Sequence, residues 1–179
     1  MSRVIMFSRK IPKYHINACD PTYFVEQIWN GFNLKALGEE FIALKEDDLV
    51  DLNKHLPYHL VDQFKKSLRP RLNYNSKKYH TVRSGFRWKA GDKFSPRVWA
   101  GDPYKSKQII IAEDILITNV YDLRITSKWE FILNNKILNN DDLHVVAKND
   151  GLTMLDFLYW FQKAPFIGQV ICWNNTINY

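Results

Sequence analysis

Cysteine, glycine and proline are scarce in this chain of 179 residues, and long apolar runs are missing. The two cysteines, Cys19 and Cys172, lie far apart, which excludes a small disulfide-held fold, and we expect both to be reduced. Seven glycines and seven prolines exclude collagen-like, low-complexity and fully disordered chains. No apolar run approaches the ~18 residues of a membrane-spanning helix, and the first residues lack the apolar stretch of a signal peptide. We therefore expect a cytoplasmic protein with no membrane partner.

Several motifs that mark enzymes and metal sites are also missing. The chain has no Walker loop, no GxGxxG, no nucleophile elbow and no paired CxxC. His55 and His59 have helical spacing, but Pro57 lies between them and no third ligand is evident. The sequence therefore predicts neither a metal site nor a cofactor.

Positive charge is concentrated in the middle of the chain. Residues 65–107 contain thirteen lysines and arginines against two acids, whereas the whole chain carries a net charge of only +6. Seven aromatic residues lie among these cations: Tyr74, Tyr79, Phe86, Trp88, Phe94, Trp99 and Tyr104. Cations that hold phosphates and rings that stack on bases are typical of nucleotide and single-strand sites. The alternative is that the rings belong to the core and the lysines to a solvated surface.

The pattern of residues predicts an α+β fold. Residues 3–7 indicate a short buried strand, residues 21–33 a helix capped by Asp20, and residues 47–64 a helix that Pro57 divides or kinks. Strands are expected over 79–83, 93–99, 108–117, 123–130 and 169–173, with a hairpin over 131–138 that turns at Asn134-Asn135. Helices should begin near Asp141 or Asp142 and at Thr153. We expect a small curved sheet or barrel flanked by helices.

The segment from Lys77 to Asp92 is the most informative for chemistry. Thr81 and Arg83 are two residues apart in an expected strand, so their side chains point to one face. Lys78 joins that face only if the strand begins or bulges there. Together these residues would offer two cations and a hydroxyl to one ligand, unless they are ordinary strand, ion-pair and surface residues.

This segment resembles the ASCH family, a branch of the PUA-like β-barrels. The resemblance rests on Lys78, Thr81 and Arg83 in a K-x-x-T-x-R pattern, on the turn at Gly91-Asp92, and on Asp150 before a late helix. It implies a PUA-like barrel domain over residues 74–179, with residues 1–73 as an N-terminal strand and helical extension packed on it as one compact unit. The family also implies a cleft between barrel and helices that accommodates a nucleobase or nucleic acid.

Some members of this family are amidohydrolases that deacylate N4-acetylcytidine, which implies catalytic roles for three residues. Thr81 would be the nucleophile, Lys78 its activator and Asp150 the acid, one methylene shorter than the family's glutamate. A lysine surrounded by cations loses its proton readily once it is desolvated, which makes this chemistry coherent.

We expect the protein to bind RNA, single-stranded nucleic acid or a nucleotide in a basic cleft lined by aromatic rings. The ligand-binding residues predicted for this cleft are Arg83, Arg87, Trp88, Trp99, Tyr104, Lys105 and Lys107. The first alternative is an amidohydrolase acting on an acylated pyrimidine nucleoside through Lys78, Thr81 and Asp150. The second is a non-catalytic protein that sequesters a nucleotide or contacts a protein partner through the acidic segment Glu39–Asp51. The sequence does not distinguish RNA, DNA and free nucleotide, nor does it give the oligomeric state.

Overall fold

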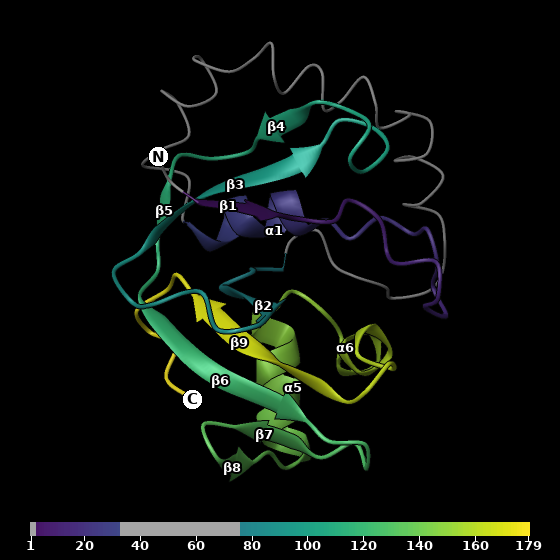
Figure 1. Ribbon diagram of the computed structural model, residues 1–179, viewed down its shortest axis with the longest axis vertical. Helices are drawn as coiled ribbons and strands as arrows, with labels where there is room; N and C mark the ends of the chain where they lie inside the picture. Colours follow the sequence, from purple (N-terminus) through teal and green to yellow (C-terminus); the bar gives the residue numbers. More distant parts are fainter. Residues whose placement is uncertain (1–2, 33–75) are drawn as a thin grey trace.

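Two β-sheets lie one above the other in the computed structural model, which describes residues 3–32 and 76–179 (Figure 1). The first sheet contains β1 (Arg3–Met6), β3 (Lys93–Trp99), β4 (Gln108–Ile110) and β5 (Ile115–Leu116). β1 runs parallel to β3, and β4 and β5 pair antiparallel with successive parts of β3. The chain is therefore α+β, with its first strand built into a sheet formed mainly by its middle third.

The second sheet has five antiparallel strands in the order β2-β9-β6-β7-β8. Its strands are β2 (His80–Ser84), β9 (Phe166–Cys172), β6 (Asn119–Ile125), β7 (Phe131–Leu133) and β8 (Lys136–Ile137). Along β6 the buried residues Tyr121, Leu123 and Ile125 alternate with exposed Asp122 and Arg124. This period of two gives the sheet one apolar face and one outward face.

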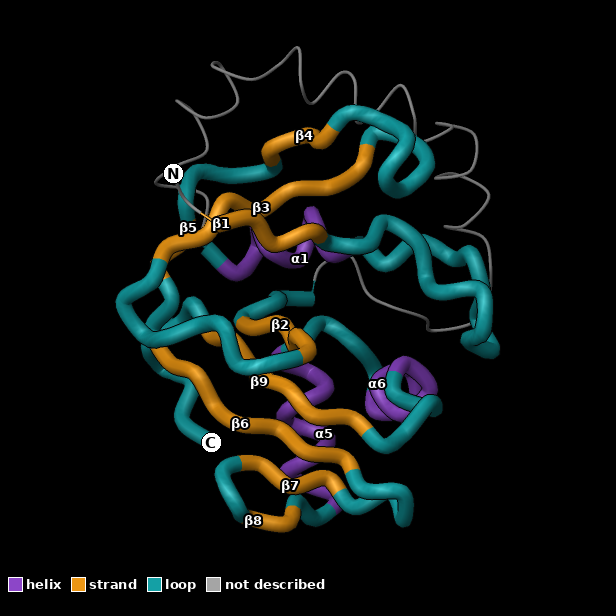
Figure 2. The backbone as a smooth tube through the Cα atoms, in the orientation of Figure 1, coloured by secondary structure: helices purple, strands orange, loops and turns teal. Residues whose placement is uncertain are grey.

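Three helices are described: α1 (Phe24–Gly31), α5 (Asn140–Asn149) and α6 (Met154–Trp160). α5 lies behind the five-stranded sheet in the view of Figures 1 and 2 and buries Leu143, Val146 and Ala147. Asn139 caps α5 in a reciprocal capping box with Asp142. None of the described helices is long and apolar enough to cross a membrane.

Aromatic side chains join the two sheets. Phe94 of β3 has its ring centroid 5.8 Å from that of Trp173, which follows β9, and 6.0 Å from that of Trp88. Phe7, just after β1, meets Trp173 edge to face at 6.1 Å. The rings that the sequence places among the cations therefore have different environments: Phe94 and Trp88 belong to the core, whereas Tyr104 is exposed.

Several sequence expectations are confirmed. The first strand forms over Arg3–Met6, although only Ile5 in it is buried. The strand at 93–99 and the hairpin at Asn134-Asn135 also form, with both asparagines at positive φ. Thr153 caps α6 by accepting a hydrogen bond from the backbone N–H of Asp156. Cys19 and Cys172 are both free.

Other expectations need correction. The two sheets of the described residues do not close into a barrel. The expected strand at 108–117 is divided into β4 and β5, and the residue that caps α1 is Tyr23 in a left-handed conformation, not Asp20. The described part of the expected extension, residues 3–32, contains a strand and one eight-residue helix. The expected helix at 47–64 and the acidic segment Glu39–Asp51 lie outside the described residues.

Candidate functional site

Lys78 lies in the interior, in the segment just before β2. Its backbone N–H donates to Gln27 of α1 at 2.9 Å, and its carbonyl accepts from the indole of Trp173 at 3.2 Å. The side chain is only 1% exposed, and its Nζ lies 4.0 Å from the centre of the Phe24 ring. The ammonium group of Lys78 would be strongly hydrated in water, so at this buried position it needs polar partners within the protein.

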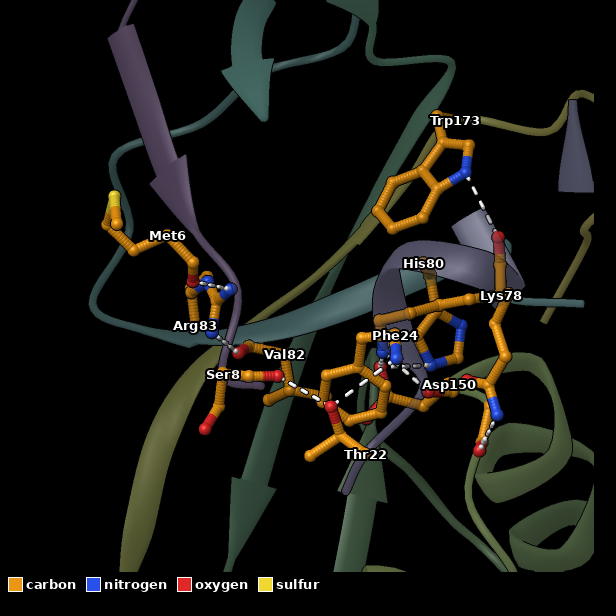
Figure 3. A network of polar contacts seen from close by, with 12 residues as sticks. Met6, Ser8, Thr22, Phe24, Lys78, His80, Val82, Arg83, Asp150 and Trp173 are labelled. Atoms are coloured by element: carbon orange, nitrogen blue, oxygen red, sulfur yellow. Dashed lines mark hydrogen bonds and ion pairs between the residues drawn. The ribbon is translucent and has the colours of Figure 1, made fainter. Parts of the chain in front are cut away.

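Asp150 is the main partner of Lys78. It ends α5, and the turn continues through Gly151, which has a φ of 77°. The Nζ of Lys78 donates to the side-chain Oδ1 and to the backbone carbonyl of Asp150, both at 2.5 Å (Figure 3). The resemblance predicts both residues as site residues, and the structure brings them into direct contact.

His80 adds a third titratable group to this buried pair. Its Nδ1 lies 2.7 Å from the hydroxyl of Tyr179, and that hydroxyl accepts from the side-chain amide of Asn149 at 3.0 Å. The Tyr179 hydroxyl therefore links His80 to Asn149 at the end of α5. Nε2 lies 3.8 Å from Oδ1 of Asp150 and has no hydrogen-bond partner within the described residues. We call Lys78, His80, Asp150 and Tyr179 the buried cluster.

Burial shifts the pKa values of the cluster in opposite directions. Desolvation lowers the pKa of Lys78 to about 8, although Asp150 opposes this shift. Desolvation likewise raises the pKa of Asp150, opposed by Lys78, and lowers the pKa of His80 well below its ordinary value, assisted by the charge of Lys78. The cluster thus combines the close Lys78–Asp150 contact with a histidine on which burial disfavours a positive charge.

Thr81 and Arg83 lie on the other face of β2. The register of β2 with β9 is regular from His80–Cys172 to Ser84–Gly168, so Thr81 and Arg83 point away from the face where His80 meets Asp150. Thr81 is 4% exposed, and its hydroxyl makes no hydrogen bond to the part of the chain described. The sequence thus predicts correctly that Thr81 and Arg83 share a face, but the structure gives Thr81 no contact with Lys78.

Arg83 joins the two sheets. Its Nη2 donates to the carbonyl of Met6 in β1 at 2.7 Å, and its guanidinium lies 5.3 Å from the Phe7 ring. Figure 3 shows Arg83 beside Met6 and apart from Lys78. Burial lowers the pKa of Arg83 to about 10. Its hydrogen bond to Met6 holds the two sheets together, while its charge also acts on Lys78 and Asp150 of the buried cluster.

Arg87 and Trp88 belong to the loop between β2 and β3. Arg87 is exposed, whereas Trp88 is buried against Phe94, and the guanidinium of Arg3 lies 4.5 Å from the centre of the Trp88 ring. The side-chain amide of Gln169 accepts from the N–H of Trp88 at 3.1 Å and donates to its carbonyl at 3.2 Å. A ligand cannot stack on the ring face that Arg3 covers.

The loop between β3 and β4 presents the other predicted residues. Tyr104 is 90% exposed and has a φ of 64°, and its ring centroid lies 5.4 Å from that of Trp99. Lys105 and Lys107 are exposed beside it. Hydrogen bonds from the Ser106 hydroxyl to the Asp102 carbonyl and from the Gly101 N–H to that hydroxyl, both 2.9 Å, fix the loop. We call residues 99–107 the aromatic loop.

The predicted binding residues therefore lie in two places. Arg87 and Trp88 precede the first residue of β3, and the aromatic loop begins at its last residue, so the seven-residue strand separates them by ~20 Å. Lys93, Ser95, Arg97 and Trp99 share one face of β3, on which Lys93 is exposed, Arg97 and Trp99 are half-buried and Ser95 is buried. Two cations, Lys93 and Arg97, therefore lie on this face between the two loops.

His80 and Tyr179 are the members of the buried cluster that sequence reasoning did not assign to the site. Strand alternation correctly predicts that His80 points away from Thr81. Only the fold shows that Asp150 lies on the same side of β2 as His80. Within residues 3–32 and 76–179, no group of three histidine, cysteine or acidic residues is arranged to hold a metal ion. Comparisons with family models, curated proteins and solved structures find no match for this chain.

Proposed function

We propose that the protein binds single-stranded nucleic acid through the aromatic loop and the face of β3 that carries Lys93 and Arg97. The observation that carries this proposal is Tyr104, an aromatic ring that is 90% exposed on a loop fixed by its own hydrogen bonds. A large exposed ring in a left-handed conformation costs stability, and Tyr104 gains only its contact with Trp99 in return. Stacking of a base on Tyr104 would cover the part of the ring that is exposed.

The charges around the loop support an anionic ligand. Lys105 and Lys107 flank the exposed ring, and Lys93 and Arg97 continue the positive charge along that face of β3. Arg87 and Lys89 are exposed at the far end of the strand. Cations spaced over this length suit successive phosphates of a strand better than one free nucleotide. The resemblance of Lys78, Thr81 and Arg83 to the ASCH pattern, and the relation to PUA-like folds that it implies, agree with this function.

The test is binding of fluorescently labelled single-stranded RNA and DNA at several salt concentrations. Tyr104→Ala should weaken binding by about 1–3 kcal/mol, since a stacked base loses its platform, whereas Tyr104→Phe should keep most of the affinity. Lys105→Ala should weaken binding and reduce its dependence on salt. Affinity that does not change with salt, or that Tyr104→Ala leaves intact, would contradict the proposal. Equal affinity for a mononucleotide and a longer strand would favour the nucleotide-sequestering alternative.

A second candidate function is deacylation of an N4-acylated cytidine, and the contact between Lys78 and Asp150 favours it. The resemblance places both residues in the catalytic machinery, and the lowered pKa of Lys78 suits an activating base. The position of Thr81 on the opposite face of β2 weighs against its role as the nucleophile. The test is release of acetate from N4-acetylcytidine. Turnover that Thr81→Ala abolishes and Thr81→Ser retains would support the candidate, and no turnover at high enzyme concentration would reject it.

A further inference from the structure

The face of the five-stranded sheet that points away from α5 carries a row of three isoleucines and one arginine across four strands. Ile137 of β8 pairs with Ile132 of β7, Ile132 pairs with Arg124 of β6, and Arg124 pairs with Ile167 of β9. Residues directly opposite each other in antiparallel strands point to the same side. The four side chains therefore form one cross-strand row.

This row faces outward. Lys136, the neighbour of Ile137 in β8, points toward α5, because its Nζ lies 2.9 Å from Oδ2 of Asp142. Ile137 therefore points to the opposite side of the sheet, away from α5. Ile137 is 63% exposed and Ile167 is 55% exposed. Figure 1 shows α5 behind this part of the sheet and no described helix in front of it.

The composition of the row differs from that of a solvated sheet face. An antiparallel sheet with one face in water normally places polar residues there, because apolar side chains gain nothing from exposure. Here three of four positions in the row are isoleucine. Exposed apolar side chains on both sides of Arg124 are typical of a surface that another protein covers.

The charges on this face identify the partner. Asp122 and Arg124 are both exposed on the outward side of β6, and neither side chain makes an ion pair or hydrogen bond within the described residues. One free acid and one free base, two positions apart, make the face complementary to itself. A two-fold axis that crosses β6 between them would set each Arg124 opposite Asp122 of the second copy, as an isologous interface requires.

We propose that this outward sheet face is the interface of a homodimer, with two reciprocal Asp122–Arg124 pairs about its two-fold axis and Ile132, Ile137 and Ile167 beside them. The interface does not involve the aromatic loop, so the dimer does not depend on nucleic-acid binding. Each charge pair fixes the register of the two sheets, and the isoleucines supply the buried apolar area.

Sedimentation equilibrium of the full chain, free of nucleic acid and at rising protein concentration, tests the proposal with charge reversals. Arg124→Asp and Asp122→Arg should each weaken association at least about tenfold, since like charges then face each other. The double variant Asp122→Arg/Arg124→Asp restores opposite charges in both pairs and should associate nearly as tightly as the wild type. Lys148→Asp, on exposed α5 behind the sheet, is the matched control and should not change association.

The uncharged variant Ile167→Ser should also weaken association and tests the row if a charge reversal prevents folding. A wild-type chain that stays monomeric at every concentration would overturn the proposal. So would a double variant no tighter than the single ones, or a Lys148→Asp variant as weak as Arg124→Asp.

Discussion

The ammonium of Lys78 lies 2.5 Å from Oδ1 of Asp150, and both side chains are almost completely buried. Lys78 approaches from the segment before β2, and Asp150 ends α5. Backbone bonds fix both ends of this contact: the N–H of Lys78 donates to Gln27, and the next residue, Tyr79, donates to the carbonyl of Asn149 at 2.8 Å. The ion pair therefore joins α1, β2 and α5 at one point.

Lys78→Met should lower the free energy of unfolding by about 3–5 kcal/mol at pH 7, because it leaves the Asp150 carboxylate buried without its counter-charge. Burial already raises the pKa of Asp150, and loss of Lys78 removes an opposing effect. In this variant the carboxyl of Asp150 keeps its proton in the folded state at pH values above 3.8, where the unfolded state has lost it. The free energy of unfolding therefore rises as the pH falls from 7 toward 3.8. Urea unfolding at pH 7 and pH 5 should show a smaller loss at pH 5.

The double variant Lys78→Met/Asp150→Leu is the control for this prediction. Removal of both charges should recover most of the lost stability, since no charge remains to be desolvated. An equal loss in Lys78→Met at both pH values would show that lost packing, and not the unpaired carboxylate, causes the effect.

His80 should make the protein less stable in mild acid. Its pKa in the folded state lies well below 6.5, so below pH 6.5 the unfolded state binds more protons and stability falls with the pH. One such group contributes up to about 1.4 kcal/mol per pH unit. Urea unfolding between pH 7 and pH 5 should show a shallower loss in His80→Asn than in the wild type. His144→Asn, at an exposed position of α5, is the matched control, and identical slopes in His80→Asn and the wild type would refute the prediction.

Gly168 allows close approach between β9 and β2. A Cβ at this position would lie 2.1 Å from the carbonyl oxygen of Arg83, so Gly168→Ala must push the two strands apart. We expect a loss of about 3 kcal/mol or more. Gly91→Ala is the comparison, because its Cβ meets nothing within 4 Å and only the φ of 88° opposes it, which should cost about 1 kcal/mol. Thermal unfolding that ranks the two variants in the reverse order would contradict this account.

Asp156 ties the segment before α1 to α6. Its Oδ1 accepts from the side-chain amide of Asn17 at 2.9 Å, and its Oδ2 accepts from the hydroxyl of Thr153 at 2.6 Å. Asp156→Asn turns an NH₂ group toward one of these donors and should cost about 1–3 kcal/mol. Urea unfolding measures the loss, and Asp141→Asn at an exposed position of α5 should change stability much less. Equal effects of the two variants would argue against the role of Asp156.

Local chemistry in the sequence predicts the elements that depend on a few neighbouring residues. Asn134-Asn135 can adopt positive φ, and the hairpin forms there, while Thr153 has a side chain that caps a helix and does so. The same residues set where the hairpin turns and where α6 begins. Asp20 is an exception, because a bridge between Lys10 and Pro21 holds the chain before α1 and leaves Tyr23 at the cap position.

Long-range pairing is where sequence reasoning fails. Nothing in the sequence of residues 3–6 indicates that they pair in parallel with β3. A reader of the sequence who does not know this pairing cannot tell two separate sheets from a single barrel. Composition correctly finds a basic, aromatic segment, but it does not show that Trp88 points into the core and Tyr104 into solvent. Alternation assigns His80 to a face of β2, whereas the groups packed on that face come from α5 and from Tyr179.

The parallel pairing of Arg3 with Phe94 has a consequence for how the chain folds during synthesis. The ribosome releases β1 about ninety residues before β3, its neighbour in the described sheet, and contacts between such distant residues slow folding. In that interval the apolar Val4, Ile5 and Met6 have an unpaired backbone on both sides. A nascent chain stalled before β3 should therefore be a substrate for chaperones, and one stalled well after β4 should not.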